Sequence, residues 1–205
     1  ISGLAVAMAF VAGTASATPV PNMVINFTET QSGGVTASFA GSAINTTGWL
    51  QYGGSASVGA QVTPNQAAFD STTANTLGWI QQSTFAGVPF GTGGSTNADT
   101  NSGDSFGYFP HFYAGPGFGI IDYFLLPSGY SGGVLSGSAT WRAATLQTLG
   151  LTPGTYYQPI GNNTFQINVT PSSPVPEIDP AGMGSVLALV TGALGVLERR
   201  RQKVA

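Results

Sequence analysis

Residues 164–169 read TFQINV, and their side chains alternate strictly between polar and apolar. The same period of two runs through 22–27 (NMVINF) and 35–39 (VTASF). This period is typical of strands that turn one face to a core and the other to water. Turn signals separate such segments at 33–34, 53–54, 93–94, 132–133, 153–154 and 161–162. The pattern predicts an all-β fold, either an antiparallel β-sandwich or a barrel-like sheet.

Between residues 18 and 175, no segment has a convincing amphipathic-helix pattern. The segment 64–70 (PNQAAFD) comes nearest, and we expect one or two helical turns that begin at Pro64, because proline suits a first helical turn. A Gly-Trp-aliphatic-Gln pattern occurs twice, at 48–51 and 78–81. A duplicated hairpin, shared core packing or chance would explain this repeat.

Composition limits the classes of function open to the chain. Only 6 % of the 205 residues are charged and 42 % are hydrophobic, whereas a soluble globular protein carries about 25 % charged residues. Arg142 is the only cation before residue 199, so no basic face for nucleic acid can form. Cysteine is absent and His111 is the only histidine, which removes thiol chemistry and metal sites with two imidazoles. We expect no cofactor and no metal centre.

The first 17 residues predict export. They combine an apolar run with the small-residue site Ala15-Ser16-Ala17, which is typical of a signal peptide cleaved between Ala17 and Thr18. The charged start of such a peptide is missing, so we expect the chain to be truncated at its front. A buried core helix is the alternative interpretation of residues 1–17.

Residues 181–197 predict a single C-terminal transmembrane helix, because they are uncharged and largely apolar. A helix of this length spans about 25 Å, at the short limit for a hydrocarbon core of about 30 Å. The tail 198–205 follows, and the positive-inside rule places it in the cytoplasm. Its basic anchor residues are Arg199, Arg200, Arg201 and Lys203.

The segment 171–180 (PSSPVPEIDP) precedes this helix, and its four prolines hold it extended. The order of motif, short apolar helix and basic cluster resembles the PEP-CTERM sorting signal of exported bacterial surface proteins, in its VPEID-type variant. The motif residues are Val175, Pro176, Glu177, Ile178 and Asp179. The resemblance implies an exosortase-type membrane protease that cleaves at or near Pro176-Glu177. It also implies a membrane-anchored precursor, followed by a cell-surface or extracellular product.

A second resemblance covers residues 125–170. The segments 126–130 (LPSGY), 135–141 (LSGSATW) and 149–156 (LGLTPGTY) are similar to the C-terminal half of a common PEP-CTERM ectodomain type. That ectodomain has no established activity, so the resemblance implies fold and localisation only, for an exported domain at 18–170. Pro159 lacks the N–H of a strand ladder and favours an edge strand or a bulge.

Few side chains of the expected exported domain could carry chemistry, and they are acids, one histidine and aromatic rings. The segment from Asp99 to Asp104 has oxygen-bearing side chains and fits either a calcium-binding loop or a plain solvated loop. Asp122 lies in an apolar run, and we expect it to face outward from a half-buried strand. His111 lies in an aromatic patch at 108–113, and we expect no catalysis by it. The aromatic patch and the tryptophans Trp49, Trp79 and Trp141 either fill the core or offer stacking faces for sugars.

These observations favour a non-enzymatic exported surface or extracellular-matrix protein. Its expected partners are an exosortase, the membrane before processing, and extracellular polysaccharide. A carbohydrate-binding module acting in that polysaccharide is the alternative, and exposed coplanar rings on one sheet face would favour it. A polysaccharide hydrolase is the third hypothesis, and it would require two acids of the domain to converge in a cleft.

Overall fold

The computed structural model describes residues 20–30, 33–52, 59–73, 76–81, 87–113 and 120–172. The chain divides into two compact units, Ile1–Pro171 and Ser172–Ala205. The predicted signal peptide, sorting motif, transmembrane helix and basic tail lie outside the described residues. Within the described ranges, no helix has both the length and the hydropathy needed to cross a membrane.

The first unit is built from β-strands that form two sheets, as the period of two predicts. One sheet, here called sheet A, has the order β12-β13-β1-β2-β11-β8, and the other, sheet B, has the order β3-β6-β10-β9-β5-β4-β7. The strands are β1 (Met23–Glu29), β2 (Val35–Gly41), β3 (Leu50–Tyr52), β4 (Gly59–Thr63), β5 (Ala68–Thr72), β6 (Thr76–Gln81), β7 (Thr96–Asn97), β8 (Thr100–Gly103), β9 (Phe106–Tyr113), β10 (Ile120–Pro127), β11 (Leu135–Trp141), β12 (Gly154–Ile160) and β13 (Asn163–Thr170).

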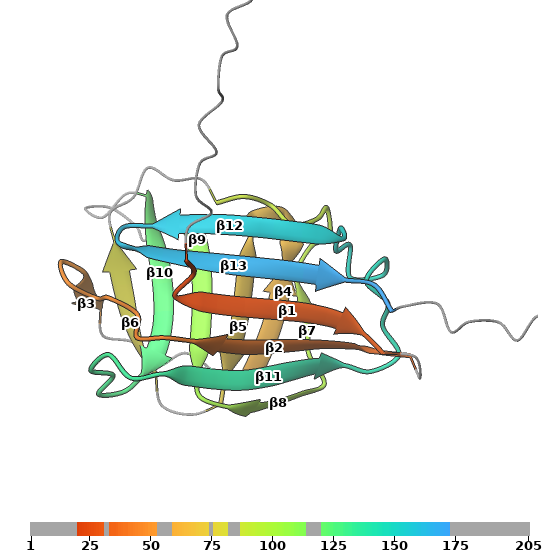
Figure 1. Ribbon diagram of the computed structural model, residues 1–205, viewed down its shortest axis with the longest axis horizontal. Coiled ribbons are helices and arrows are strands. Elements are labelled where there is room, and N and C mark those ends of the chain that lie inside the picture. The colour runs from red at the N-terminus through yellow and green to blue at the C-terminus, as the bar shows by residue number, and fades with distance from the viewer. Residues whose placement is uncertain are drawn as a thin grey trace, which may run out of the picture. The chain divides into compact units, whose positions relative to one another are not determined.

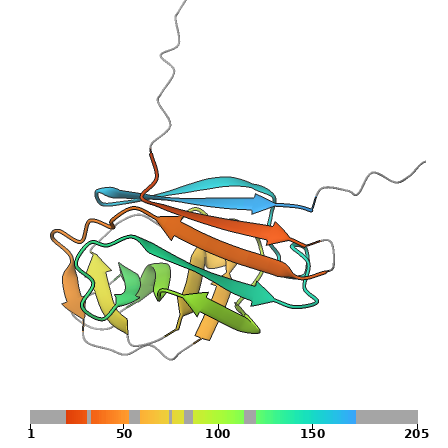
Figure 2. The ribbon, with the colours of Figure 1, turned by 60° about the horizontal axis from the view of Figure 1, so that its bottom comes forward.

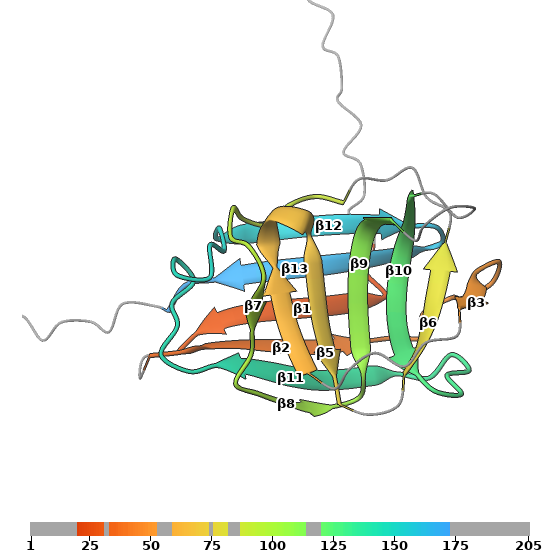
Figure 3. The ribbon, with the colours of Figure 1, turned by 180° about the vertical axis from the view of Figure 1, so that it is seen from behind.

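The two sheets stack face to face as a sandwich. Sheet A lies in front in Figure 1, and its strands run across those of sheet B behind it; Figure 3 shows sheet B from the other side. Figure 2 shows the two layers as separate levels. This crosswise arrangement belongs to the orthogonal class of sheet packing. The prediction of an all-β sandwich is confirmed for the described part of residues 18–170.

Sheet A joins the two ends of the domain. Strands β1 and β13 pair in parallel, with Met23 opposite Phe165 and Phe27 opposite Val169, while the other neighbours in both sheets are antiparallel. Strand β12 lies at the edge of sheet A and contains Pro159. Of the two alternatives for Pro159, an edge strand or a bulge, the structure confirms the edge strand, because an edge position tolerates a residue without an N–H.

Aromatic rings from the two sheets meet between the layers. The ring of Phe27 in β1 meets the ring of Phe69 in β5 edge-on, with 5.7 Å between the centroids. The ring of Phe165 in β13 packs at 5.5 to 5.9 Å against Phe106, Tyr108 and Phe124 of sheet B. Burying one such side chain contributes about 1.5–3 kcal/mol. The apolar half of each alternating strand therefore forms the core.

The predicted helical turns at 64–70 are confirmed only at their start. A 3-10 turn, η1 (Pro64–Gln66), begins at Pro64, and the N–H of Ala67 donates to the carbonyl of Pro64 at 3.2 Å. Ala67 then adopts a left-handed conformation at φ 55°, and β5 begins at the next residue. Pairing with β4 and β9 satisfies the backbone of β5, so pairing between strands overrides the local tendency to form a helix.

The two Gly-Trp-aliphatic-Gln segments lie next to each other. Leu50 in β3 pairs with Ile80 in β6, and Gln51 pairs with Trp79. The repeat therefore corresponds to neighbouring antiparallel strands at one edge of sheet B.

One side of the sandwich is closed where the chain passes from β7 in sheet B to β8 in sheet A. The side-chain amide of Asn101 in β8 donates to the carbonyl of Gly59 at 3.1 Å and to that of Thr72 at 2.9 Å. These carbonyls belong to paired residues at one end of β4 and β5. Asn101 therefore links the edge of sheet A to sheet B.

Candidate functional site: the uncharged outer face of sheet A

The outward side chains of sheet A carry no charge at any of its described strand positions. Inward and outward positions alternate along its strands, and the inward ones are mostly buried. We call the outward set the polar face. Its members are Val24, Asn26, Thr28, Thr36, Ser38, Ala40, Thr100, Ser102, Ser136, Ser138, Thr140, Thr155, Tyr157, Pro159, Thr164, Gln166, Asn168 and Thr170.

Strand register aligns threonines into one row across five strands. The cross-strand partners are, in spatial order, Thr170, Thr28, Thr36, Thr140 and Thr100. The hydroxyls of Thr36 and Thr140 share a hydrogen bond of 3.4 Å. Threonine suits this position because its β-branched side chain packs well on a pleated surface.

A second row runs beside the first and crosses all six strands. Its members, in spatial order, are Thr155, Asn168, Asn26, Ser38, Ser138 and Ser102. The Asn168 amide donates to Asn26 Oδ1 at 2.8 Å, and the hydroxyl of Thr155 donates to Asn168 Oδ1 at 3.1 Å. The hydroxyls of Ser138 and Ser102 share a hydrogen bond of 3.0 Å. These bonds orient the polar atoms of the row before any ligand arrives.

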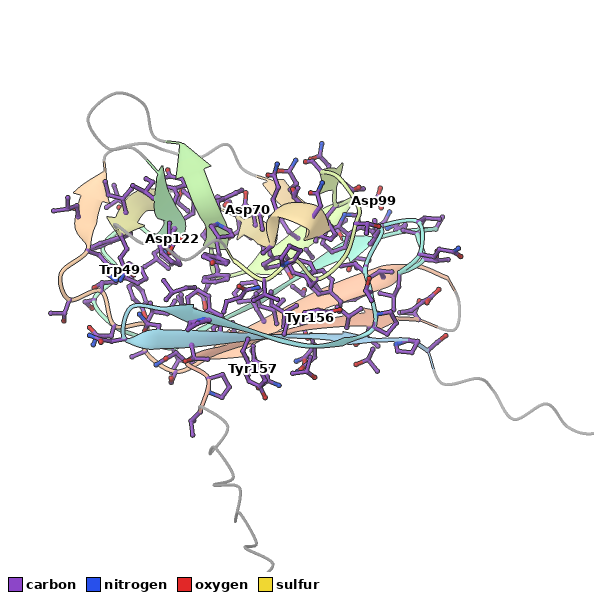
Figure 4. All side chains as sticks on the ribbon, turned by 90° about the horizontal axis from the view of Figure 1, so that it is seen from above. Trp49, Asp70, Asp99, Asp122, Tyr156 and Tyr157 are labelled. Carbon is purple, nitrogen blue, oxygen red and sulfur yellow. The ribbon has the colours of Figure 1, made fainter. Side chains whose placement is uncertain are left out.

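A third row joins the polar face at Tyr157, which pairs with Gln166. The side-chain amide of Gln166 donates to Asn168 Oδ1 at 2.9 Å and so connects the second and third rows. Figure 4 shows Tyr157 on the outer side of sheet A, while Tyr156 points between the sheets. Tyr157 is half-buried, and it is the only aromatic ring on the polar face as described.

The polar face can make many hydrogen bonds but no ion pair. Neighbouring rows are separated by two residues along each strand, about 6.6 Å, and neighbouring members of a row by about 4.8 Å. A hydroxyl both donates and accepts, and so does an amide side chain. The chemistry therefore matches a neutral partner that is itself rich in hydroxyl groups.

The segment between Asp99 and Asp104 is an edge strand, β8, so the prediction of a loop is wrong. Asp99 Oδ2 accepts the backbone N–H of Arg142 at 2.5 Å, and Asp104 Oδ2 accepts that of Ser136 at 2.8 Å. Asp99 precedes β8 and Asp104 follows it, so the two carboxylates bind opposite ends of β11. In the described part of the chain, no three His, Cys, Asp or Glu side chains are grouped so that they could hold a metal ion.

Asp122 is fully buried, so the prediction of an outward position is wrong. It lies two residues before the buried Phe124, beside an irregularity in the pairing of β10 with β9 between Ile121 and Tyr123. Burial raises the pKa of the Tyr108 hydroxyl, and the negative charge of Asp122 raises it further. Both alternating sets of β10 are apolar, so the sequence could not show which set Asp122 would join.

Asp70 in β5 is the titratable group that sequence reasoning missed. Burial raises the pKa of its carboxyl to about 6, against the lowering effect of the Thr72 hydroxyl, which donates to Asp70 Oδ1 at 2.5 Å. Its strand neighbour Ser71 bonds to the Ser138 carbonyl of sheet A, so Asp70 points the other way, to the outside of sheet B. The described aspartates come from different elements: Asp70 from β5, Asp122 from β10, and Asp99 and Asp104 from the two ends of β8.

Two of the tryptophans belong to the core, as one of the two interpretations predicted. Trp49 is 8 % exposed and stacks on Phe124 at 4.3 Å, and Trp141 is 2 % exposed. Trp79 is half-buried and packs against the same core. None of the three lies on the polar face. The side chain of His111 lies outside the described part of the structure.

No protein-family model, no curated protein and no solved structure matches this chain. The signal-cleavage residues, the sorting motif from Val175 to Asp179 and the basic anchor lie outside the described residues. Their roles stay predictions from the sequence.

The polar face could have been anticipated in part. Each alternating segment of the sequence has uncharged residues at its polar positions. The rows themselves depend on register, which pairs residues as distant as Asn26 and Asn168. No local pattern contains that information.

Proposed function

We propose that this chain is an exported, non-enzymatic surface or extracellular-matrix protein. The observation that carries this proposal is the polar face, a broad outer surface of hydroxyl and amide groups without a charge. Such a surface can contact neutral material outside the cell through many weak hydrogen bonds.

The sorting signal supplies the route to that location. An exosortase-type protease would read the proline-held segment Val175-Pro176-Glu177 while the apolar helix 181–197 holds the precursor in the membrane. Glu177 is the one charged residue in the segment Val175-Pro176-Glu177-Ile178, so a cationic or hydrogen-bonding pocket could recognise it. The basic anchor would keep the tail on the cytoplasmic side.

The test of sorting compares Glu177→Ala with the wild-type chain in a host that has an exosortase. We expect full-length precursor to accumulate in the membrane fraction, while the exported domain still folds. Intact mass of the released protein is the measurement, and Ser173→Ala in the same proline-rich segment is the matched control. Release of the Glu177→Ala protein at normal size and rate would show that the segment is only a linker.

Binding of neutral polysaccharide is the second candidate function. The described polar face carries one ring, Tyr157, and no set of coplanar rings, so its lack of charge is what favours this function. The measurement is co-sedimentation of the exported protein with cellulose, in crystalline and swollen forms, and with anionic alginate beads. We expect retention on cellulose at both low and high salt, because uncharged groups make the contacts. Retention on alginate alone would contradict this function.

A further inference from the structure

The side chains of the polar face are held in place before they meet a ligand. Asn26, Asn168 and Thr155 form a chain of hydrogen bonds across three strands. The pair Ser102 and Ser138 and the pair Thr36 and Thr140 are bonded in the same way. Serine, threonine and asparagine are short, and threonine is stiff at χ1. Little rotamer freedom therefore remains to be lost on binding.

The same bonds limit what each side chain can contribute. Asn168 Oδ1 already accepts from both Thr155 and Gln166, and the Asn168 amide already donates to Asn26. A hydrogen bond exchanged with water contributes about 0.5–1.5 kcal/mol net. Binding through this face therefore requires many simultaneous contacts over several strands.

A flexible soluble chain is a poor match for such a surface. It loses conformational freedom when it is ordered on the protein, and this cost offsets most of what a few weak bonds contribute. Polymer chains that are already packed side by side have lost that freedom beforehand. They also present hydroxyls in a repeating plane, as the polar face does in its rows.

We propose that the polar face binds the ordered surface of a packed, neutral, hydroxyl-rich polysaccharide, and not a single soluble chain of it. This inference rests on the second candidate function, polysaccharide binding, and names the physical form of the ligand. The ligand is expected to be neutral because the described positions of the polar face carry no charge, so polyanions and polycations gain nothing there.

The probe is cellulose in two physical forms, crystalline and acid-swollen, together with soluble cellohexaose. Binding isotherms of the exported protein are measured for each solid at equal accessible surface. We expect crystalline cellulose to retain the protein about tenfold more tightly than the swollen form, and excess cellohexaose not to displace it.

The matched variants are Ser38→Lys and Thr92→Lys. Ser38 is exposed at the centre of the second row, between Asn26 and Ser138, whereas Thr92 is exposed in the segment before β7. Both add the same charge at an exposed position. We expect Ser38→Lys to weaken retention on crystalline cellulose by about tenfold or more and Thr92→Lys to leave it unchanged. Far-ultraviolet circular dichroism checks that both variants fold.

The outcomes separate this inference from the function on which it rests. Equal or tighter retention on swollen cellulose, or displacement by cellohexaose, overturns the inference and leaves polysaccharide binding in place. Retention that Ser38→Lys does not weaken overturns the assignment to the polar face. Retention on neither form of cellulose overturns both the inference and the second candidate function.

Discussion

At the scale of single residues, the Asp70 carboxyl makes stability depend on pH. Its pKa is raised from 3.8 to about 6, so the folded state holds a proton that the unfolded state has released between these values. Stability from this group is fully present below pH 3.8 and is lost as the pH rises through about 6.

Asp70→Asn should therefore stabilise the domain at neutral pH. Solvent screening reduces the effect at a half-buried carboxyl, and we expect the free energy of unfolding at neutral pH to rise by about 1–3 kcal/mol. Urea denaturation below pH 3.8 and at neutral pH measures it, and the two proteins should agree at the acidic end.

Thr72→Val is the companion to that variant. It removes the hydroxyl that lowers the Asp70 pKa, so the loss of stability with rising pH should become larger and continue to a higher pH. A pH dependence that is the same in Asp70→Asn and the wild type would refute the assignment to this carboxyl.

Tyr108 gives a second prediction at the residue scale. Its hydroxyl is buried and has no hydrogen-bond partner among the described residues, while its ring stacks on Phe124 at 5.2 Å. Tyr108→Phe keeps the ring and removes the buried hydroxyl. We expect the free energy of unfolding to rise by about 1 kcal/mol, because an unsatisfied polar group no longer has to be desolvated.

The matched control is Tyr156→Phe. The Tyr156 hydroxyl donates to the carbonyl of Thr152 at 2.8 Å, so its loss should lower the free energy of unfolding by about 0.5–1.5 kcal/mol. Thermal unfolding measures both variants. A lower melting temperature for Tyr108→Phe would mean that its hydroxyl is bonded after all.

At the scale of elements, the link between β8 and sheet B depends on Asn101. Asn101→Ala leaves the carbonyls of Gly59 and Thr72 without this donor at the closed side of the sandwich. We expect the free energy of unfolding to fall by about 1–3 kcal/mol, measured by urea denaturation.

Ser102→Ala, the next residue of β8, is the control for this element. Ser102 points outward and shares one exposed hydrogen bond with Ser138, so its loss should change stability by less than about 0.5 kcal/mol. Equal effects of the two variants would show that the link from Asn101 contributes nothing particular.

Strand β8 also shows what a local sequence pattern cannot predict. The residues from Asp99 to Asp104 are polar and contain glycine, so they resemble a loop. They form a strand because β11 offers a complete partner from Gly137 to Thr140. A strand whose residues have weak intrinsic preference forms only when its neighbour is in place.

At the scale of the whole molecule, β1 depends on β13, the last strand, for one of its two pairing partners. β1 lies between β2 and β13, and β13 supplies Phe165, Ile167 and Val169 to the core. A chain ended after Gly161 should therefore show no cooperative unfolding, whereas a chain ended after Pro171 keeps every described strand. Circular dichroism during heating distinguishes them, and a cooperative transition in the shorter chain would contradict the prediction.

The sequence alone determined the all-β class, the alternating strands within 22–27, 35–39 and 164–169, and the near absence of charge, because a period of two is local and can be read within one segment. It also limited Pro159 to an edge strand or a bulge, since a missing N–H is a property of that residue, and the sheet order then decided for the edge. Only the tertiary structure decided which strands are neighbours, and hence the threonine row and the parallel pairing of β1 with β13. It also decided on which side Asp122 lies. Pairing joins residues far apart in the chain, such as Asn22 and Thr164, and it is selected by packing of the complete core, which no single segment contains.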